Sequence, residues 1–313
     1  MAISRRDKLY LLGFLLGAGI LLFLGRDLLQ SSIIVTYGLT FGGTTAAAVL
    51  LAVLYRLRLE LKASRHELAR KEAELNFALE VQRALFPSQL PLNGGLEFAA
   101  ICIPARGISG DYYDVMELPD GRIIFAIADI SGKGISAAIL MANLQAVMRT
   151  LAQTGKSPKE ICSSLNYHLH QVTDAARFAT FFYAEWDISE RRLTYINAGH
   201  HMPIITGSCT EKLDKGGLPL GILPNYDYQV GEIALQPGDL MVLYSDGITE
   251  ASNIDDVEFG EKRLAAIIDA NCSEPLPEIQ RRVLLAVQEW SGDEQEDDMT
   301  LLLMRATLDK EER

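Results

Sequence analysis

Residues 123–134 read IIFAIADISGKG, and this stretch decides how the rest of the chain is interpreted. Its six leading apolar residues are too few to span a bilayer, so they predict a buried strand. The strand ends at Asp129, and the glycines that follow are typical of a tight turn. The sequence therefore predicts a carboxylate at the end of a buried strand, where a rigid scaffold commonly positions catalytic groups.

Three further aspartates have a similar local setting. Residues 240–245, LMVLYS, lead directly into Asp246; Asp111 follows a Ser-Gly pair, and Asp297 precedes the final apolar segment. Oxygen ligands without clustered His or Cys favour Mg²⁺ or Mn²⁺ over zinc. Two such ions, about 3.5–4 Å apart, suit hydrolysis of a phosphate ester. The alternative is that each aspartate is a solvated turn residue, and the spacing does not decide between the two.

Length and charge limit the classes of partner. The 313 residues suffice for one sizeable core with an appendage. Of 29 Lys and Arg, 11 lie in residues 1–90, whereas 34 of the 41 Asp and Glu lie beyond them. An acidic main body argues against nucleic acid as a partner, because phosphate neutralisation needs a basic face.

The four cysteines are Cys102, Cys162, Cys209 and Cys272. They form no C-x-x-C pair, so the sequence predicts neither a disulfide framework nor a zinc ribbon. We expect them to be reduced thiols in the core.

Two apolar segments predict a transmembrane helical hairpin over residues 1–55. Residues 9–25 contain no charge and are about the minimum length for a span, and residues 33–55 are a fully adequate one. The alternative for the first segment is a cleaved signal peptide, although no small-x-small cleavage site follows it. Basic residues flank the hairpin on both outer sides, which predicts an inner or plasma membrane protein with both termini and the main domain in the cytoplasm.

Residues 56–86 predict a helical linker. The segment is charged and free of Gly and Pro until Pro87, so it is expected to continue the helix of the second span. Leucines recur every seven residues from Leu54 to Leu75, although polar residues, among them Gln82, interrupt the seam. This pattern favours a parallel dimeric coiled coil, and hence a homodimer. The alternative is a single helix whose apolar stripe packs on its own domain.

Residues 87–313 predict a separate α+β domain. A capping box begins one helix at Ser157, and pairs of helices alternate with runs of adjacent strands. This order indicates an antiparallel layered fold and not a βαβ repeat. The predicted strands cover residues 96–104, 123–129, 181–187, 192–197, 201–206, 228–234, 239–245 and 299–305.

Eight short motifs follow one another within residues 80–304. They are SGDYYD at 109–114, DISGKG at 129–134, TFF at 180–182, NAGH at 197–200, GLPLG at 217–221, YSDGITEA at 244–251, FG at 259–260 and DDMT at 297–300. In this order they resemble the metal-dependent PPM-class serine/threonine phosphatases, specifically the bacterial SpoIIE/RsbU branch. A match of this many motifs in register is highly specific, although any one motif alone is weak.

The resemblance implies an α/β/β/α sandwich, in which helices flank two antiparallel sheets and two Mn²⁺ or Mg²⁺ ions lie at one end. Asp129 would bridge both ions, and Asp297, rather than its neighbour Asp298, matches the family's ligand position. Asp111 would bind directly or through water. The implied metal ligands are Asp111, Asp129, the carbonyl of Ile130, Asp246 and Asp297, and the four aspartates are also the implied catalytic residues.

Other polar residues near the motifs leave the source of the leaving-group proton open. Ser131 stands in the region where eukaryotic relatives carry a histidine general acid. His200 and His201 invite a catalytic interpretation, but their place at a strand-to-turn junction favours a structural, hydrogen-bonding histidine. Lys133 lies in a Gly-Lys-Gly sequence that lacks the other P-loop residues, and it could approach a substrate phosphate.

The expected function is that of a membrane-anchored, Mn²⁺- or Mg²⁺-dependent protein phosphatase. By resemblance, its substrate would be phosphoserine or phosphothreonine on a cytoplasmic regulatory protein, typically a STAS-type anti-sigma-factor antagonist. Two alternatives stay open at this point. One is a catalytically weak, membrane-tethered scaffold of the same fold that binds a partner. The other is a phosphatase that acts on a small phosphoester or a lipid headgroup.

Overall fold

A computed structural model of the chain describes residues 13–14, 16–20, 23, 25, 33–91, 94–105, 107–173, 177–208, 212–292 and 295–308. The contacts divide the chain into two units, Met1–Glu72 and Ala73–Arg313. Part of the first predicted span and the whole loop after it lie outside the described residues, as does Cys209.

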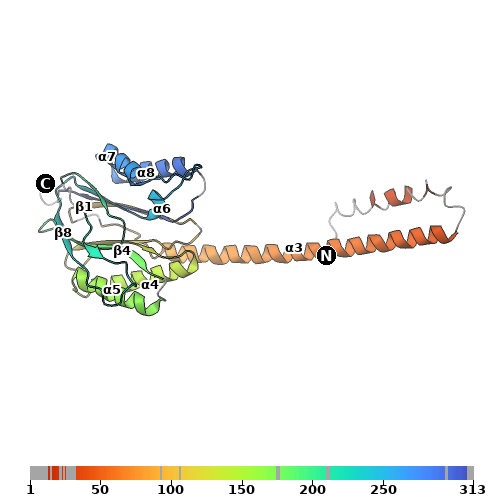
Figure 1. Cartoon of the computed structure of the whole chain (residues 1–313), viewed down its shortest axis with the longest axis horizontal. Coiled ribbons are helices and arrows are strands. Elements are labelled where there is room, and N and C mark those ends of the chain that lie inside the picture. The colour runs from red at the N-terminus through yellow and green to blue at the C-terminus, as the bar shows by residue number, and fades with distance from the viewer. Residues whose placement is uncertain are drawn as a thin grey trace. The chain divides into compact units, whose positions relative to one another are not determined.

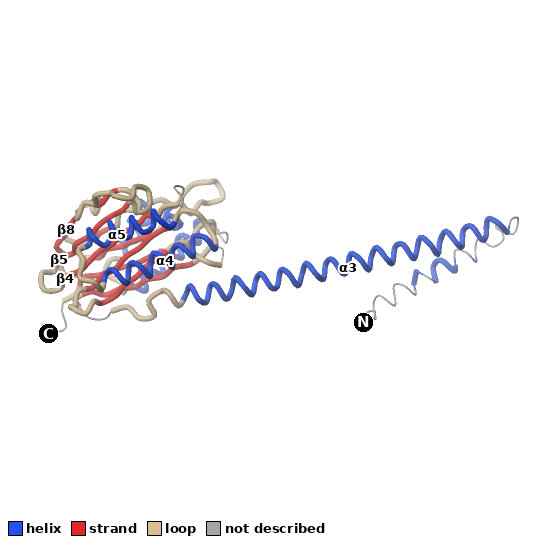
Figure 2. Tube along the Cα trace, turned by 90° about the horizontal axis from the view of Figure 1, so that it is seen from below, coloured by secondary structure: helices blue, strands red, loops and turns tan. Residues whose placement is uncertain are grey.

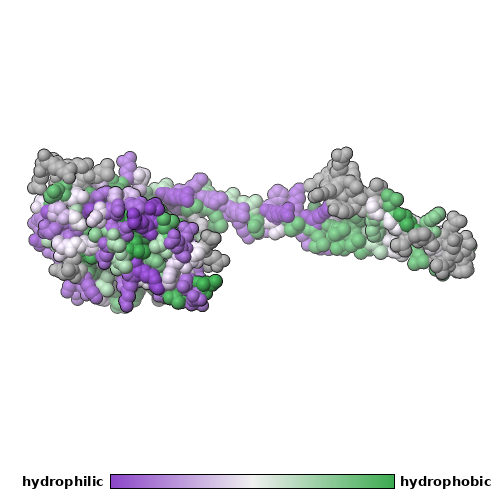
Figure 3. Space-filling model, turned by 90° about the horizontal axis from the view of Figure 1, so that it is seen from above, coloured by the Kyte–Doolittle hydropathy of each residue, from purple (hydrophilic) through white to green (hydrophobic). Residues whose placement is uncertain are grey.

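Helix α3, Ile33–Arg83, runs without interruption through the second predicted span and most of the predicted linker. Its first part carries exposed apolar side chains, among them Ile34 and Phe41, which are 83% and 76% exposed. Figure 3 shows hydrophobic surface along this part and hydrophilic side chains along the part that follows. The helix is long and apolar enough to cross a membrane. The predicted continuity is therefore confirmed, whereas the hairpin and the coiled coil stay predictions.

Two sheets form the centre of the second unit (Figure 1). Nearly all neighbouring strands are antiparallel; the exception is the short parallel pair β5 and β7. One sheet has the order β1 (Leu96–Ile103), β10 (Met299–Ala306), β9 (Leu240–Tyr244) and β6 (Ile204–Thr206). The other has the order β2 (Tyr112–Glu117), β3 (Ile123–Ile130), β4 (Ala179–Asp187), β5 (Arg192–Ala198) and β7 (Gly216–Gly217), with β8 (Gly231–Ala234) also on β5.

Helices cover the outer face of each sheet. Helices α4 (Ile135–Ala152) and α5 (Pro158–Val172) pack on the larger sheet, as Figure 2 shows. Helices α7 (Glu261–Asn271) and α8 (Leu276–Ser291) pack on the smaller sheet. The predicted sandwich of two sheets flanked by helices is therefore confirmed. The short helix α6 (Asp246–Thr249) follows β9 directly.

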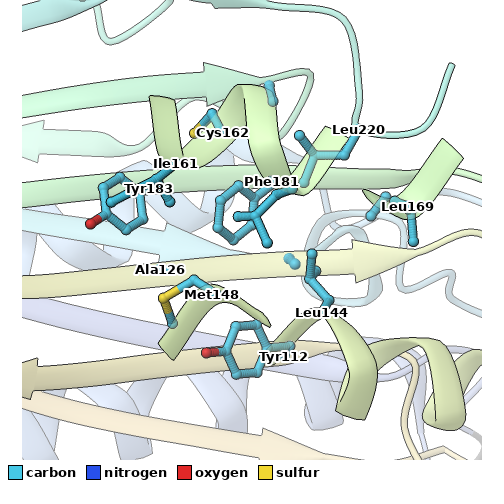
Figure 4. Close-up of a cluster of buried hydrophobic side chains, with 14 of the residues drawn as sticks. Tyr112, Ala126, Leu144, Met148, Ile161, Cys162, Leu169, Phe181, Tyr183 and Leu220 are labelled. Carbon is cyan, nitrogen blue, oxygen red and sulfur yellow. The ribbon is translucent and has the colours of Figure 1, made fainter. Parts of the chain in front are cut away.

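The apolar run at 123–128 lies in β3, and both of its faces are buried. Phe125 and Ile127 face the core between the two sheets, whereas Ala126 and Ala128 face α4 and α5. Figure 4 shows the second of these cores, in which Met148 of α4 packs beside Ala126. A central strand with two dry faces carries no alternating polar residues, and this explains why the run is continuous.

Several elements differ from the sequence-based prediction, which did not include β7 or α6. Strand β2 was not expected, because Asp114 interrupts its apolar residues, yet this carboxylate is fully buried and paired with Arg149. Strand β6 is shorter than predicted residues 201–206, and β8 is shorter than predicted residues 228–234. Before β8, Tyr228 is buried as a loop residue, whereas Met202 before β6 and Val230 before β8 are exposed.

Candidate metal centre

The carboxylate of Asp129 lies at the end of β3, where this strand pairs with Thr180 of β4. Two hydrogen bonds fix the turn that follows: the Ser131 amide donates to the Phe178 carbonyl (2.9 Å), and Ser131 Oγ accepts from the Phe178 amide (2.8 Å). Gly132 has a φ of 100°, which favours glycine. The predicted strand end is thus a rigid support for Asp129.

Asp111 is buried directly before β2, and only 2% of its surface is exposed. Its Oδ2 atom is buried and has no hydrogen-bond partner among the described residues. Such an oxygen is costly unless a proton or a cation satisfies it. Burial, and then the charge of Asp129, raises the pKa of Asp111 well above its usual range. Asp111 is therefore placed to receive a cation.

Asp246 begins α6 immediately after β9. The next residue, Gly247, approaches the loop before β10 so closely that a Cβ atom there would lie 2.1 Å from the carbonyl oxygen of Asp298. This approach requires glycine. Asp246 is consequently brought near Asp297, whose charge, after burial, raises the pKa of Asp246.

The adjacent residues Asp297 and Asp298 have different surroundings. The Asp298 carboxylate accepts three hydrogen bonds, from the Ala105 amide (2.8 Å), Ser109 Oγ (2.9 Å) and the Gly110 amide (2.7 Å). It therefore holds the loop that precedes Asp111. Asp297 instead presents Oδ2 to the Lys133 ammonium, 2.7 Å from Nζ. The charge of Asp297 acts on Asp129 and Asp246, whereas the charge of Asp298 acts on Asp111 and Asp129.

The predicted carbonyl ligand, Ile130, follows Asp129 at the end of β3. Its carbonyl oxygen lies 3.3 Å from the position that a Cβ atom on Gly110 would take, and the Ala137 side chain lies 3.2 Å from that position. The Ser-Gly loop thus packs directly against the turn after β3. This packing brings Asp111 next to Asp129.

The four predicted aspartates therefore lie near one another: Asp129 at the end of β3, Asp246 at the start of α6, and Asp111 and Asp297 in the loops before β2 and β10. Burial, and then the charges of Asp246, Asp297 and Asp298, raises the pKa of Asp129 to about 7. Mutual repulsion of this kind is typical of carboxylates that share a cation. Among the described residues, however, no three His, Cys, Asp or Glu side chains form a metal cluster by themselves. Water would complete the coordination shell, as is usual for Mg²⁺.

Two cavities border these aspartates. One, of about 290 Å³, lies at Asp129 and Asp246, and its lining also includes Thr180, His200, His201 and Glu261. The other, of about 430 Å³, lies at Asp297, and its charged lining residues are Lys133, Glu250, Glu296 and Asp297. Asp129, Asp246 and Asp297 are thus accessible to a substrate from the surface, whereas the buried Asp111 lines neither cavity.

The two histidines have different environments. His200 is buried; its Nδ1 atom is 2.8 Å from Thr180 Oγ1, and its amide donates to Asn197 Oδ1 (2.8 Å). Burial, and then the charge of His201, lowers the pKa of His200 to about 3. These hydrogen bonds agree with a structural role for His200, but its buried Nε2 atom has no hydrogen-bond partner among the described residues, and the side chain also lines the smaller cavity. His201 is exposed, stacks on the ring of Tyr244 and lines the smaller cavity.

Sequence reasoning missed the role of Gln82, which it treated only as an interruption of the leucine seam. The side chain is buried, donates from Nε2 to the Ser109 carbonyl (2.7 Å) and accepts from the Ser109 amide at Oε1 (2.8 Å). Only the polarity of Gln82 at a seam position indicated such a contact.

Sequence reasoning also assigned no role to Asp114. Its carboxylate accepts two hydrogen bonds, of 2.6 and 2.9 Å, from the guanidinium of Arg149 in α4.

Comparisons with known proteins agree with this geometry. Residues 119–307 match the family described as Stage II sporulation protein E (SpoIIE). The chain is 32% identical over 238 residues to phosphoserine phosphatase RsbU of Bacillus subtilis, a match that covers 75% of this chain and 70% of RsbU.

Solved structures share the fold. The SiaA-PP2C domain of Pseudomonas aeruginosa has a TM-score of 0.66 and 22% identity, and the alignment covers 76% of this chain and 97% of that domain. RsbX in complex with magnesium has a TM-score of 0.54 and 18% identity, and the alignment covers 70% of this chain and 99% of RsbX. At these identities, the likeness establishes the architecture of the sandwich.

Proposed function

Since the chain belongs to the SpoIIE family of PP2C-type serine/threonine protein phosphatases, we propose that it is a membrane-anchored, Mn²⁺- or Mg²⁺-dependent enzyme that dephosphorylates a cytoplasmic protein. The observation that carries this proposal is the convergence of four aspartates on one end of the sandwich. An acidic cluster beside two accessible cavities suits a cationic cofactor and a phosphorylated substrate.

The donor set fits two hard cations. The aspartates, the Ile130 carbonyl and water offer only oxygen atoms, and the buried Oδ2 atom of Asp111 needs a partner. Asp129 interacts electrostatically with Asp111 and also with Asp246 and Asp297, so it suits the bridging position. When bound, two such ions supply an activated water and stabilise charge during in-line displacement at phosphorus. The magnesium complex of RsbX supports this choice of cation.

The substrate would be phosphoserine or phosphothreonine on a small regulatory protein. The name of RsbU, a phosphoserine phosphatase, supports this class of substrate. A STAS-type anti-sigma-factor antagonist is the partner that we propose. Its phosphorylated segment would reach the aspartates through one of the two cavities that border them.

Helix α3 supports a membrane-anchored enzyme. Its first part is apolar and exposed over a length that can cross a bilayer, and basic residues such as Arg56 and Arg58 follow this part. We propose that residues 1–55 form two spans and that the phosphatase domain is cytoplasmic. We also propose that the linker helices of two chains pair in a coiled coil.

The test uses the full chain in detergent micelles with Mn²⁺ and a phosphoserine peptide. We expect wild-type protein to release phosphate, and Asp129→Asn and Asp246→Asn to lose at least about 100-fold in rate. Asp227→Asn is the matched control, because Asp227 is an exposed aspartate that pairs with Lys159 outside the site. Unchanged turnover in both site variants would reject the two-metal mechanism.

The same assay separates the alternatives. A catalytically weak scaffold would release no phosphate from any substrate, although it would still bind its partner. A small-molecule phosphatase would turn over a generic phosphoester at low concentration and leave the phosphoserine peptide unchanged. Efficient turnover of the peptide supports the protein phosphatase.

A further inference from the structure

Lys133 lies at the boundary between the aspartates and the larger cavity. Its Nζ atom is 2.7 Å from Oδ2 of Asp297 and 3.2 Å from the carbonyl oxygen of Glu296. Its charge also opposes the rise in the pKa of Asp129 and of Asp246, which burial and neighbouring carboxylates cause. One ammonium group therefore acts on aspartates from the end of β3, the start of α6 and the loop before β10.

The charge on the cavity wall makes this lysine important for an anionic substrate. Among the described residues that line the larger cavity, Lys133 is the sole cation, and three carboxylates accompany it, those of Glu250, Glu296 and Asp297. A phosphoserine dianion that enters this cavity meets repulsion from these carboxylates. Lys133 is the side chain on the cavity wall that can offset this repulsion at short range.

A divalent cation bound to Asp297 can take the place of the Lys133 ammonium in this ion pair. Asp297 is also a proposed metal ligand, so a divalent ion and the Lys133 ammonium compete for the same carboxylate. The lysine side chain is 54% exposed, and its flexible four-carbon stem allows the ammonium to move without displacing the backbone. An ammonium released from Asp297 remains beside the metal centre.

We propose that Lys133 binds the phosphoryl oxygens of the substrate, exchanging the Asp297 carboxylate for phosphate when cations occupy the aspartates. This inference rests on the proposed phosphatase function. It assigns to Lys133 a direct contact with the substrate. The competing interpretation is structural: Lys133 would only tie the turn after β3 to the loop before β10.

The test compares wild type, Lys133→Ala and Lys133→Arg as full chains in detergent micelles. The control is Lys159→Ala, because Lys159 forms an exposed ion pair of the same length, 2.7 Å, with Asp227. Three quantities are measured: KM for a phosphoserine peptide, the inhibition constant of inorganic phosphate, and Mn²⁺ binding, which follows from the electron paramagnetic resonance signal of free Mn²⁺. Wild-type turnover of the peptide is established first, and its failure would reject the proposed function rather than the role of Lys133.

We expect Lys133→Ala to raise KM and the phosphate inhibition constant about tenfold or more, as loss of a charged hydrogen bond predicts. Mn²⁺ should bind as tightly as in wild type or more tightly, because a competing cation is gone. Lys133→Arg should recover most of the phosphate affinity, and Lys159→Ala should match wild type. Unchanged phosphate inhibition in Lys133→Ala would overturn the proposal. Weaker inhibition that merely follows weaker Mn²⁺ binding would also overturn it, in favour of the structural role.

Discussion

The side-chain amide of Gln82 makes two hydrogen bonds with the backbone of Ser109, at 2.7 and 2.8 Å. Ser109 Oγ in turn donates to Asp298 (2.9 Å) and accepts from the Asp111 amide (2.9 Å). One buried side chain near the end of α3 thus fixes the loop that carries a proposed metal ligand. The last residues of α3, which belong to the second unit, are therefore linked through Ser109 to Asp111.

Replacement of this side chain should affect both stability and activity. Gln82→Ala leaves the Ser109 amide and carbonyl without their partner, which should cost about 1–3 kcal/mol in the free energy of unfolding. Displacement of Asp111 should lower the Mn²⁺-dependent rate by about 10- to 100-fold. Chemical denaturation and the phosphopeptide assay measure the two effects. The control is Val81→Ala, because Val81 is 52% exposed on the same helix. An active, fully stable Gln82→Ala protein would contradict the proposed support.

The pKa of Asp129 predicts how stability depends on pH when a chelator removes divalent cations. Burial and neighbouring aspartates raise this pKa from an ordinary 3.8 to about 7 in the folded protein. At pH values between these two pKa values, Asp129 is protonated in the folded state and ionised in the unfolded state. The free energy of unfolding should therefore fall as pH rises from about 4 to 7, by at most about 1.4 kcal/mol per pH unit from this group.

Urea denaturation in EDTA at several pH values measures this dependence. Asp129→Asn should flatten the curve, because the amide does not titrate in this range. Saturating Mn²⁺ should reverse the trend in wild-type protein, since a cation stabilises the ionised carboxylates and a proton competes with it. The same pH dependence in wild type and Asp129→Asn would show that the pKa of Asp129 is not raised.

Much of this arrangement could be predicted from sequence because its signals are local. The apolar run that ends at Asp129 identifies a strand with two buried faces, and the capping box at Ser157 starts α5 as expected, with Glu160 bonded to the Ser157 amide (2.9 Å). The strand and the helix depend on neighbouring residues in the chain. The four aspartates, in contrast, were assigned from the resemblance that the order of the motifs carries.

The contacts that escaped prediction join residues far apart in the sequence. Asp298 accepts hydrogen bonds from a loop nearly 190 residues earlier, so nothing beside it in the chain distinguishes its role from that of Asp297. The polar side chains of Gln82 and Asp114 lie among apolar residues and interrupt the patterns that predict helices and strands. Each is compatible with burial only because a distant partner satisfies it.

Asp114 provides the last prediction, because its carboxylate is fully buried and bonded to Arg149 of α4 and to the Tyr112 hydroxyl. Arg149→Ala would leave a buried charge without its partner, which should cost about 3–5 kcal/mol in the free energy of unfolding. Arg192→Ala is the control: it breaks an exposed ion pair with Glu232 and should cost less than about 1 kcal/mol. Asp114→Asn added to Arg149→Ala should recover part of the loss, since the amide carries no charge. Equal losses in the two single variants, measured by chemical denaturation, would show that this ion pair does not anchor α4 to β2.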